Sequence, residues 1–216
     1  MNEFQTKLYN DLMSLVASNE AFYFQDFTSG AHTYRIFNYR LAFYTDFQLP
    51  GALECRGVMF EVDDDQALNL CALTMEKFFN LNENPMTTGL DLTSVVEILE
   101  KVDGSLMSTY MEDGVLKLKS KGSISSEQAI AAMKWLEGEG QRLFKENLRQ
   151  ATLNGYTVNL EWCSPIHRII IGYPVAHLKV LNARNRETGC YAERNFLKDA
   201  FDARNVVSEV LTVDPI

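Results

Sequence analysis

The sequence predicts an α+β protein in which largely antiparallel sheets are flanked by helices. Short runs rich in β-branched and aromatic residues follow one another with turn residues between them, and stretches with helical spacing of apolar residues stand apart from these runs. Because predicted strands neighbour predicted strands along the chain, they are expected to pair antiparallel, which favours the α+β class.

The first elements are expected to be one helix and then strands. Apolar residues recur at helical spacing over residues 3–18, which predicts an amphipathic helix: Phe4, Leu8, Leu12, Leu15 and Val16. Strands are predicted over residues 34–39 and 57–62, with breaks at Pro50-Gly51 and at the aspartates 63–65. A further strand is predicted over residues 95–99, ending just before Lys101.

The elements after Lys101 are expected to be a hairpin, helices and further strands. Residues 105–111 and 115–119 flank Glu112-Asp113-Gly114, a hairpin turn signal. Ser125 followed by Gln128 resembles a capping box, which predicts a helix that ends near Gly138 and Gly140. The remaining expectations are a helix from 141 to about 153, strands over 157–163, 168–173 and 178–184, a turn at 187–189 and a short helix over 195–204.

Length and composition predict a single cytoplasmic domain over residues 1–216. The chain is 46% hydrophobic, enough to bury one sizeable core. No stretch approaches the roughly 18 unbroken apolar residues of a membrane span, and the first residues lack the pattern of a signal peptide. The cysteines at 55, 71, 163 and 190 form no Cys-x-x-Cys pair and are expected to be reduced core thiols.

The charge balance limits how the chain can contact nucleic acid. Its formal net charge is −9, whereas proteins that coat nucleic acid draw on clustered Lys and Arg. Any contact with RNA is therefore expected to be local.

The run Lys101-Val102-Asp103-Gly104 is the first candidate for chemistry. A surface turn would explain this tetrapeptide on its own, but further segments accompany it in a fixed order. They are Tyr34-Arg-Ile-Phe-Asn-Tyr39, Glu54-Cys-Arg-Gly57, Met75-Glu-Lys-Phe-Phe-Asn-Leu-Asn-Glu83, Lys119-Ser-Lys-Gly-Ser123 and Asn159-Leu-Glu-Trp162.

With these segments the sequence resembles, from its first helix to about Gly189, the RNA ligase 1 family of T-even-type bacteriophages. That family belongs to the covalent nucleotidyltransferase superfamily, with DNA ligases and mRNA capping enzymes. The resemblance implies a ligase adenylation fold and ATP as cofactor. It also implies that Lys101 attacks the α-phosphate of ATP, forms a lysyl-AMP phosphoramidate and releases pyrophosphate. The AMP would pass to an RNA 5′-phosphate, and a 3′-hydroxyl would displace it, as in the repair of nicked tRNA ends.

Cations near Lys101 are expected to serve this chemistry, because they favour the neutral amine and stabilise phosphate charge. By resemblance Arg56, Lys77 and Lys121 line the ATP pocket; taken singly, each could instead be a solvated lysine or an ion-paired arginine. Gly104 is expected to let the backbone approach phosphate or ribose closely.

A carboxylate and two aromatic residues complete the expected set. Glu161 lies on a predicted strand, where a buried charge needs a partner. The resemblance makes it essential, holding either hydrated Mg²⁺ or the ribose, while an edge-strand salt bridge is the alternative. Tyr39 and Phe79 match family positions at the nucleotide pocket, although core packing is the commoner use of an aromatic residue. Mg²⁺ is implied by ATP chemistry, with no residue assigned as its ligand.

The chain departs from the family after the strand predicted over residues 178–184. The family continues with a Glu-Gly-x-Val strand, a Lys-x-Lys strand and a helical C-terminal domain that recognises tRNA, and none of these occurs before Ile216. We therefore expect either a truncated adenylyltransferase domain, whose missing lysines a second polypeptide could supply, or a non-catalytic binder of ATP or RNA ends. The apolar run over 206–213 predicts a final strand or a contact for absent chain.

The leading hypothesis is an ATP-dependent RNA ligase, or its N-terminal part, acting as a monomer. A capping guanylyltransferase or a DNA ligase would share the lysine motif. The segment from Met75 to Glu83 favours RNA ligase over both.

Overall fold

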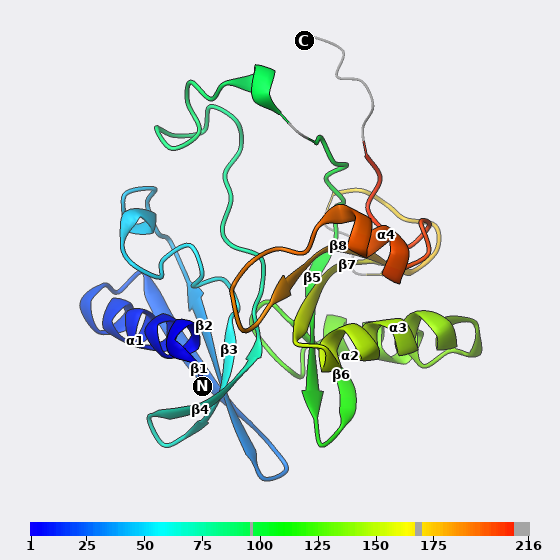
Figure 1. Cartoon of the computed structure of the whole chain (residues 1–216), viewed down its shortest axis with the longest axis horizontal. Coiled ribbons are helices and arrows are strands. Elements are labelled where there is room, and N and C mark those ends of the chain that lie inside the picture. Colours follow the sequence, from blue (N-terminus) through cyan, green and yellow to red (C-terminus); the bar gives the residue numbers. More distant parts are fainter. Residues whose placement is uncertain (96, 167–169, 210–216) are drawn as a thin grey trace.

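The computed structural model describes residues 1–95, 97–166 and 170–209 and contains two four-stranded sheets that lie side by side (Figure 1). The strand order is β1-β2-β3-β4 in the first sheet and β6-β5-β7-β8 in the second. Every paired strand is antiparallel to its neighbour, which confirms the predicted α+β class.

The first sheet carries the N-terminal helix on one face. Its elements are α1 (Glu3–Ser18), β1 (Phe22–Ser29), β2 (His32–Tyr39), β3 (Met59–Asp63) and β4 (Gln66–Ala72), with a short 3₁₀ helix at Asp46–Gln48. Asn2 caps α1 by accepting a hydrogen bond from the backbone N–H of Gln5. The apolar stripe of α1, including Leu8 and Leu12, packs against Phe37 and Phe60. The predicted helix over residues 3–18 is confirmed.

Helices cover the second sheet on the face that points away from the first sheet. Its elements are β5 (Ser105–Glu112), β6 (Val115–Ser120), α2 (Glu127–Leu136), α3 (Arg142–Leu153), β7 (Tyr156–Cys163), β8 (His177–Asn185) and α4 (Arg194–Ala200), with 3₁₀ helices at Leu92–Ser94 and Glu139–Gln141. Leu116, Leu118, Val158 and Leu160 turn toward the helices and form the larger core. The predicted hairpin around Asp113 is confirmed.

The uncovered faces of the two sheets meet each other. Tyr34, Ile36 and Met59 of the first sheet pack with Tyr110 of the second. The chain then leaves β4 and makes a long excursion over residues 73–104, drawn at the top of Figure 1, before it enters β5. This excursion carries Lys77 and Lys101, so both lysines lie on the connection between the sheets.

Two predicted strands are wrong wherever the structure describes them. Residues 95 and 97–99 form no strand, because Leu99 pairs only through a single bridge with Glu209; residue 96 lies outside the described residues. Residues 170–173 also form no strand, since the backbone N–H groups of Ile170 and Ile171 donate to the Asp103 carboxylate; residues 168 and 169 lie outside the described part. An apolar run does not make a strand without a neighbouring edge to pair with.

Smaller corrections concern caps, boundaries and two missed strands. The cap of α2 is Ser126, which accepts from the N–H of Ala129, so the Ser125–Gln128 capping box is wrong. The helix expected over 195–204 ends at residue 200, and neither β1 nor β4 was predicted. Cys190 is exposed, unlike the other three cysteines, so it is not a core thiol. Of the run over 206–213, Val206 makes a single bridge to Val180, and 210–213 lie outside the described residues.

Within the described ranges, no helix is both long and apolar enough to span a bilayer.

Candidate active site

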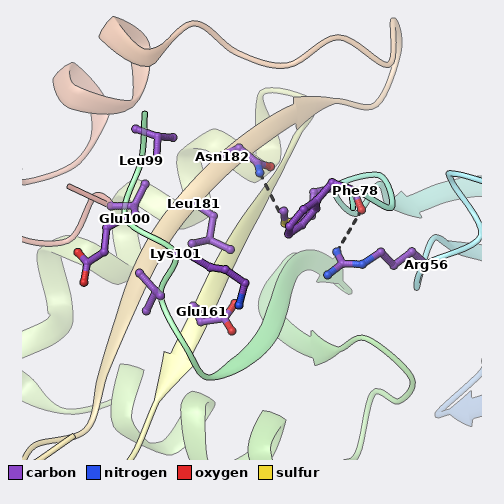
Figure 2. Close-up of a pocket in the computed structure, with 11 residues that line it drawn as sticks. Arg56, Phe78, Leu99, Glu100, Lys101, Glu161, Leu181 and Asn182 are labelled. Carbon is purple, nitrogen blue, oxygen red and sulfur yellow. Dashed lines mark hydrogen bonds between the residues drawn. The ribbon is translucent and has the colours of Figure 1, made fainter. Parts of the chain in front are cut away.

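Lys101 and Glu161 lie in one pocket of about 400 Å³ at the junction of the two sheets (Figure 2). Figure 2 shows the Lys101 side chain extending toward the Glu161 carboxylate, with Arg56 approaching from the first sheet. The pocket is lined by Arg56, Met75, Phe78, Leu99, Glu100, Lys101, Val102, Glu161, Leu181, Asn182 and Val207. The fold thus brings together three residues that are far apart in the sequence and that the motifs had singled out.

Gly104 joins the Lys101 segment to strand β7. Its N–H donates to Glu161 Oε1 at 2.9 Å, and a Cβ added to Gly104 would lie 2.3 Å from the Trp162 carbonyl oxygen. Gly104 therefore makes a close approach to the backbone of β7 that leaves no room for a side chain, while its predicted approach to phosphate or ribose stays a prediction. Gly104 thus fixes the position at which the Lys101 segment enters β5.

The Glu161 carboxyl is easy to protonate in this setting. Burial raises its pKa to about 7, while the hydrogen bond from Gly104 and the charges of Arg56 and Lys101 act in the opposite direction. A carboxyl group with a pKa near neutrality can exchange a proton at physiological pH.

Arg56 is held at the rim of the pocket by neighbouring backbone. Its Nη1 donates to the Met75 carbonyl at 3.4 Å, and its guanidinium lies 5.5 Å from the centroid of the Phe78 ring. The Thr74 hydroxyl donates to the Arg56 carbonyl. No ion pair to a carboxylate is found for Arg56 among the described residues, so the guanidinium is available to an anion.

Lys77 and Lys121 lie beside Arg56 and rest on aromatic rings. The Nζ of Lys77 is 4.2 Å from the Phe79 ring centroid, and that of Lys121 is 4.9 Å from the Tyr39 ring centroid. Burial first, then the charges of Arg56 and Lys77, lowers the pKa of Lys121. Mutual repulsion of three nearby cations is relieved by an anion, which makes this cluster suited to a polyphosphate.

Tyr39 and Phe79 serve as packed supports in the structure. Both rings meet Phe47 edge to face, at centroid distances of 4.9 and 5.4 Å. The ammonium groups of Lys121 and Lys77 lie over the Tyr39 and Phe79 rings, respectively. Their predicted stacking on adenine stays a prediction.

Arg56 and Lys121 are held at a fixed spacing by Gly57. A Cβ on Gly57, whose φ is +100°, would come within 2.6 Å of the Lys121 carbonyl oxygen. The Gly57 carbonyl accepts a hydrogen bond of 2.7 Å from Lys119, whose side chain is fully buried on β6. This junction connects the two sheets directly behind the cation cluster.

The motifs did not identify Met75, Phe78 and Asn182 as pocket residues. Phe78 stands next to the predicted Phe79, and its 50% exposure distinguishes the two only in the folded chain. For Asn182 the sequence carried no distinct signal, because Lys179 and Arg184 also interrupt the apolar residues of the strand predicted over 178–184.

The two antiparallel sheets, with a pocket that contains Lys101 and Arg56 where they meet, have the architecture of the α+β nucleotidyltransferase fold. A solved structure titled Archaeal ATP-dependent RNA ligase - form 2 shares the fold, with a TM-score of 0.57 and 12% identity over 93% of this chain and 49% of that one.

The chain belongs to the RNA ligase family, whose sequence profile matches residues 54–210. RNA ligase 1 of Bacteriophage TS2126 is 27% identical over 152 residues, which is 67% of this chain and 38% of that protein. A putative RNA ligase of Thermovibrio ammonificans is 27% identical over 155 residues, 71% of this chain and 40% of that protein. The match thus spans about two fifths of the length of these relatives.

Proposed function

We propose that this chain is the nucleotidyltransferase part of an ATP-dependent RNA ligase and that Lys101 is its nucleophile. The observation that carries the proposal is the shared pocket of Lys101 and Glu161, rimmed by Arg56 with Lys77 and Lys121 close by. Among the described residues these cations form no ion pair with a carboxylate, which leaves them available for phosphate.

In the proposed first step, the neutral Lys101 amine attacks the α-phosphorus of ATP. An N–P bond forms, the bond from the α-phosphorus to the pyrophosphate oxygen breaks, and the nitrogen gives up a proton to water. Arg56, Lys77 and Lys121 would hold the phosphates and spread the charge of the leaving pyrophosphate. Positioning would come from Gly104, which anchors the Lys101 segment to β7.

Mg²⁺ fits this site as an ion shared with the nucleotide. No cluster of three or more His, Cys, Asp or Glu side chains suited to a metal exists in the described part of the chain. Bound Mg²⁺ commonly uses only one or two carboxylates and completes its shell with phosphate and water, so Glu161 is a sufficient protein ligand. The ion would neutralise phosphate charge when bound.

The wider activity is proposed from the family. The substrate would be RNA with a 5′-phosphate and a 3′-hydroxyl, such as nicked tRNA ends, in the cytoplasm of the cell. The Glu-Gly-x-Val and Lys-x-Lys strands do not follow β8 in this sequence and would come from a second polypeptide that joins the otherwise monomeric chain. Binding of ATP or RNA ends without catalysis is the alternative.

The test is covalent labelling of the chain by α-labelled ATP with Mg²⁺. We expect an acid-labile, base-stable label on Lys101 that is lost in Lys101→Ala and kept in Lys117→Ala, a β6 lysine whose partner is Glu112. Labelling by GTP in preference to ATP would indicate a capping-type enzyme instead. If no label forms, even after a polypeptide with the missing motifs is added, the chain is a binding module.

A further inference from the structure

A row of polar side chains crosses the second sheet and ends in the pocket. Ser108 of β5 is the Cα partner of Asn159 of β7, and Asn159 is the partner of Asn182 of β8. Ser108 and Asn159 are 1% and 0% exposed, on the face that looks toward the first sheet. Buried amides are costly unless their hydrogen bonds are satisfied, so the direction of each bond in this row is informative.

The bonds of Asn159 fix which way its amide points. Its Oδ1 accepts from the Ser108 hydroxyl at 2.6 Å, and its Nδ2 donates to Asn182 Oδ1 at 2.9 Å and lies 3.5 Å from the Leu73 carbonyl oxygen. A flipped Asn159 would place its own oxygen against the Leu73 carbonyl. The Asn159 nitrogen therefore faces Asn182 and occupies the oxygen of that side chain.

The nitrogen of Asn182 is consequently directed at the pocket. Its acceptor within the described residues is the Met75 sulfur at 3.7 Å, and a thioether is a weak acceptor. Figure 2 shows Asn182 on β8 beside Leu181, with this bond running toward Phe78. A fixed donor thus faces space in which it has no strong partner.

The surroundings of this donor suit a flat, mostly apolar group. The pocket is lined there by Met75, Phe78, Leu99, Val102, Leu181 and Val207. Phe78 is half exposed and offers a ring face, while Lys77 and Lys121 are not among the lining residues. The phosphates of a nucleotide would lie near Lys77 and Lys121, outside this apolar region. The apolar region is then left for the nucleobase.

We propose that Asn182 Nδ2 donates a hydrogen bond to a ring nitrogen of the adenine whose nucleotide modifies Lys101, and that Asn159 holds the amide in this orientation. This inference rests on the proposed function for the identity of the nucleotide. Because the oxygen of Asn182 is turned toward Asn159, the residue presents its nitrogen to the pocket and selects for an acceptor on the base.

The experiment measures equilibrium binding by calorimetry to Lys101→Met, which cannot form the covalent bond. The ligands are ATP and its 1-deaza, 3-deaza and 7-deaza analogues, each lacking one ring nitrogen. We expect one analogue to bind about five- to tenfold more weakly than ATP, as for the loss of one neutral hydrogen bond. Adding Asn182→Leu should weaken ATP to the same level and abolish the difference. Asn147→Leu, which removes an amide that bonds Ala200 on the far side of the sheet, should change neither.

Several results would overturn the inference. Equal binding of ATP and all three analogues would do so even if Asn182→Leu fails to fold. A loss confined to 2′-deoxy-ATP or 3′-deoxy-ATP, removed by Asn182→Leu, would place the donor on the ribose instead of the base. The labelling of wild-type Lys101 is scored separately: base-selective binding without label would reject the proposed ligase chemistry alone, and label without base selectivity would reject the role of Asn182 alone.

Discussion

Breaking the buried ion pair between Glu54 and Arg184 should strongly destabilise the fold, and Glu54→Gln tests this. Arg184 is 3% exposed and donates from both Nη atoms to the Glu54 carboxylate, at 2.6 and 2.8 Å. It also donates to the carbonyls of Thr74 and Gly189. The pair connects β8 to the segment that carries Arg56, so its loss should affect both the fold and the pocket.

The structure sets the expected size of the effect. Removing one partner of a buried pair leaves an uncompensated charge and costs roughly 3–5 kcal/mol. The neutral glutamine keeps one acceptor, and the two backbone carbonyls remain, so we expect the lower end, about 3 kcal/mol. In a domain of this size each kcal/mol lowers the melting temperature by roughly 2–4 °C, which predicts a drop of about 6–12 °C.

Urea unfolding and thermal melting at pH 7 would measure this change. Glu137→Gln is the matched control, because Glu137 pairs with Lys145 at 2.7 Å on the surface, where the same substitution should cost less than about 1 kcal/mol. The double variant Glu54→Gln, Arg184→Met should recover part of the loss, since it removes the unpaired cation. If Glu54→Gln is no more destabilising than Glu137→Gln, the pair does not hold β8 to the Arg56 segment.

Three further substitutions probe the site itself. Gly104→Ala should reduce Lys101 labelling by about two orders of magnitude, because the added Cβ would lie 2.3 Å from the Trp162 carbonyl oxygen and displace Lys101. The control Gly140→Ala, at a position with open space around it, should be labelled normally. The raised pKa of Glu161, about 7, predicts that the ligand-free protein loses stability as pH rises from about 4.5 to 7, and Glu161→Gln should remove this slope in melting curves. Burial lowers the pKa of Lys119 to about 7, so the charge of Lys119 destabilises the fold most below pH 7. Lys119→Met should therefore raise the melting temperature more at pH 6 than at pH 9. An equal rise at both pH values would refute the lowered pKa.

Local sequence patterns predicted an element correctly where its structure depends on residues close in the sequence. The helical spacing in residues 3–18 and the Glu112-Asp113-Gly114 turn each specify their own geometry, and both are confirmed. The same reasoning missed β1, where polar residues interrupt the aromatic ones and Asp26 pairs with Arg35 on β2. A partner on another strand is not visible in the local pattern.

The sequence by itself determined the family, the Lys101 motif and the cations that accompany it, because residue identity and spacing are properties of the chain alone. Only the tertiary structure decided that Gly104 packs against β7, that Lys119 is buried behind Arg56 and that Asn182 turns its amide nitrogen into the pocket. These features depend on cross-strand register and on the junction of two sheets, which bring together residues up to about a hundred positions apart, and no local period in the sequence encodes that distance.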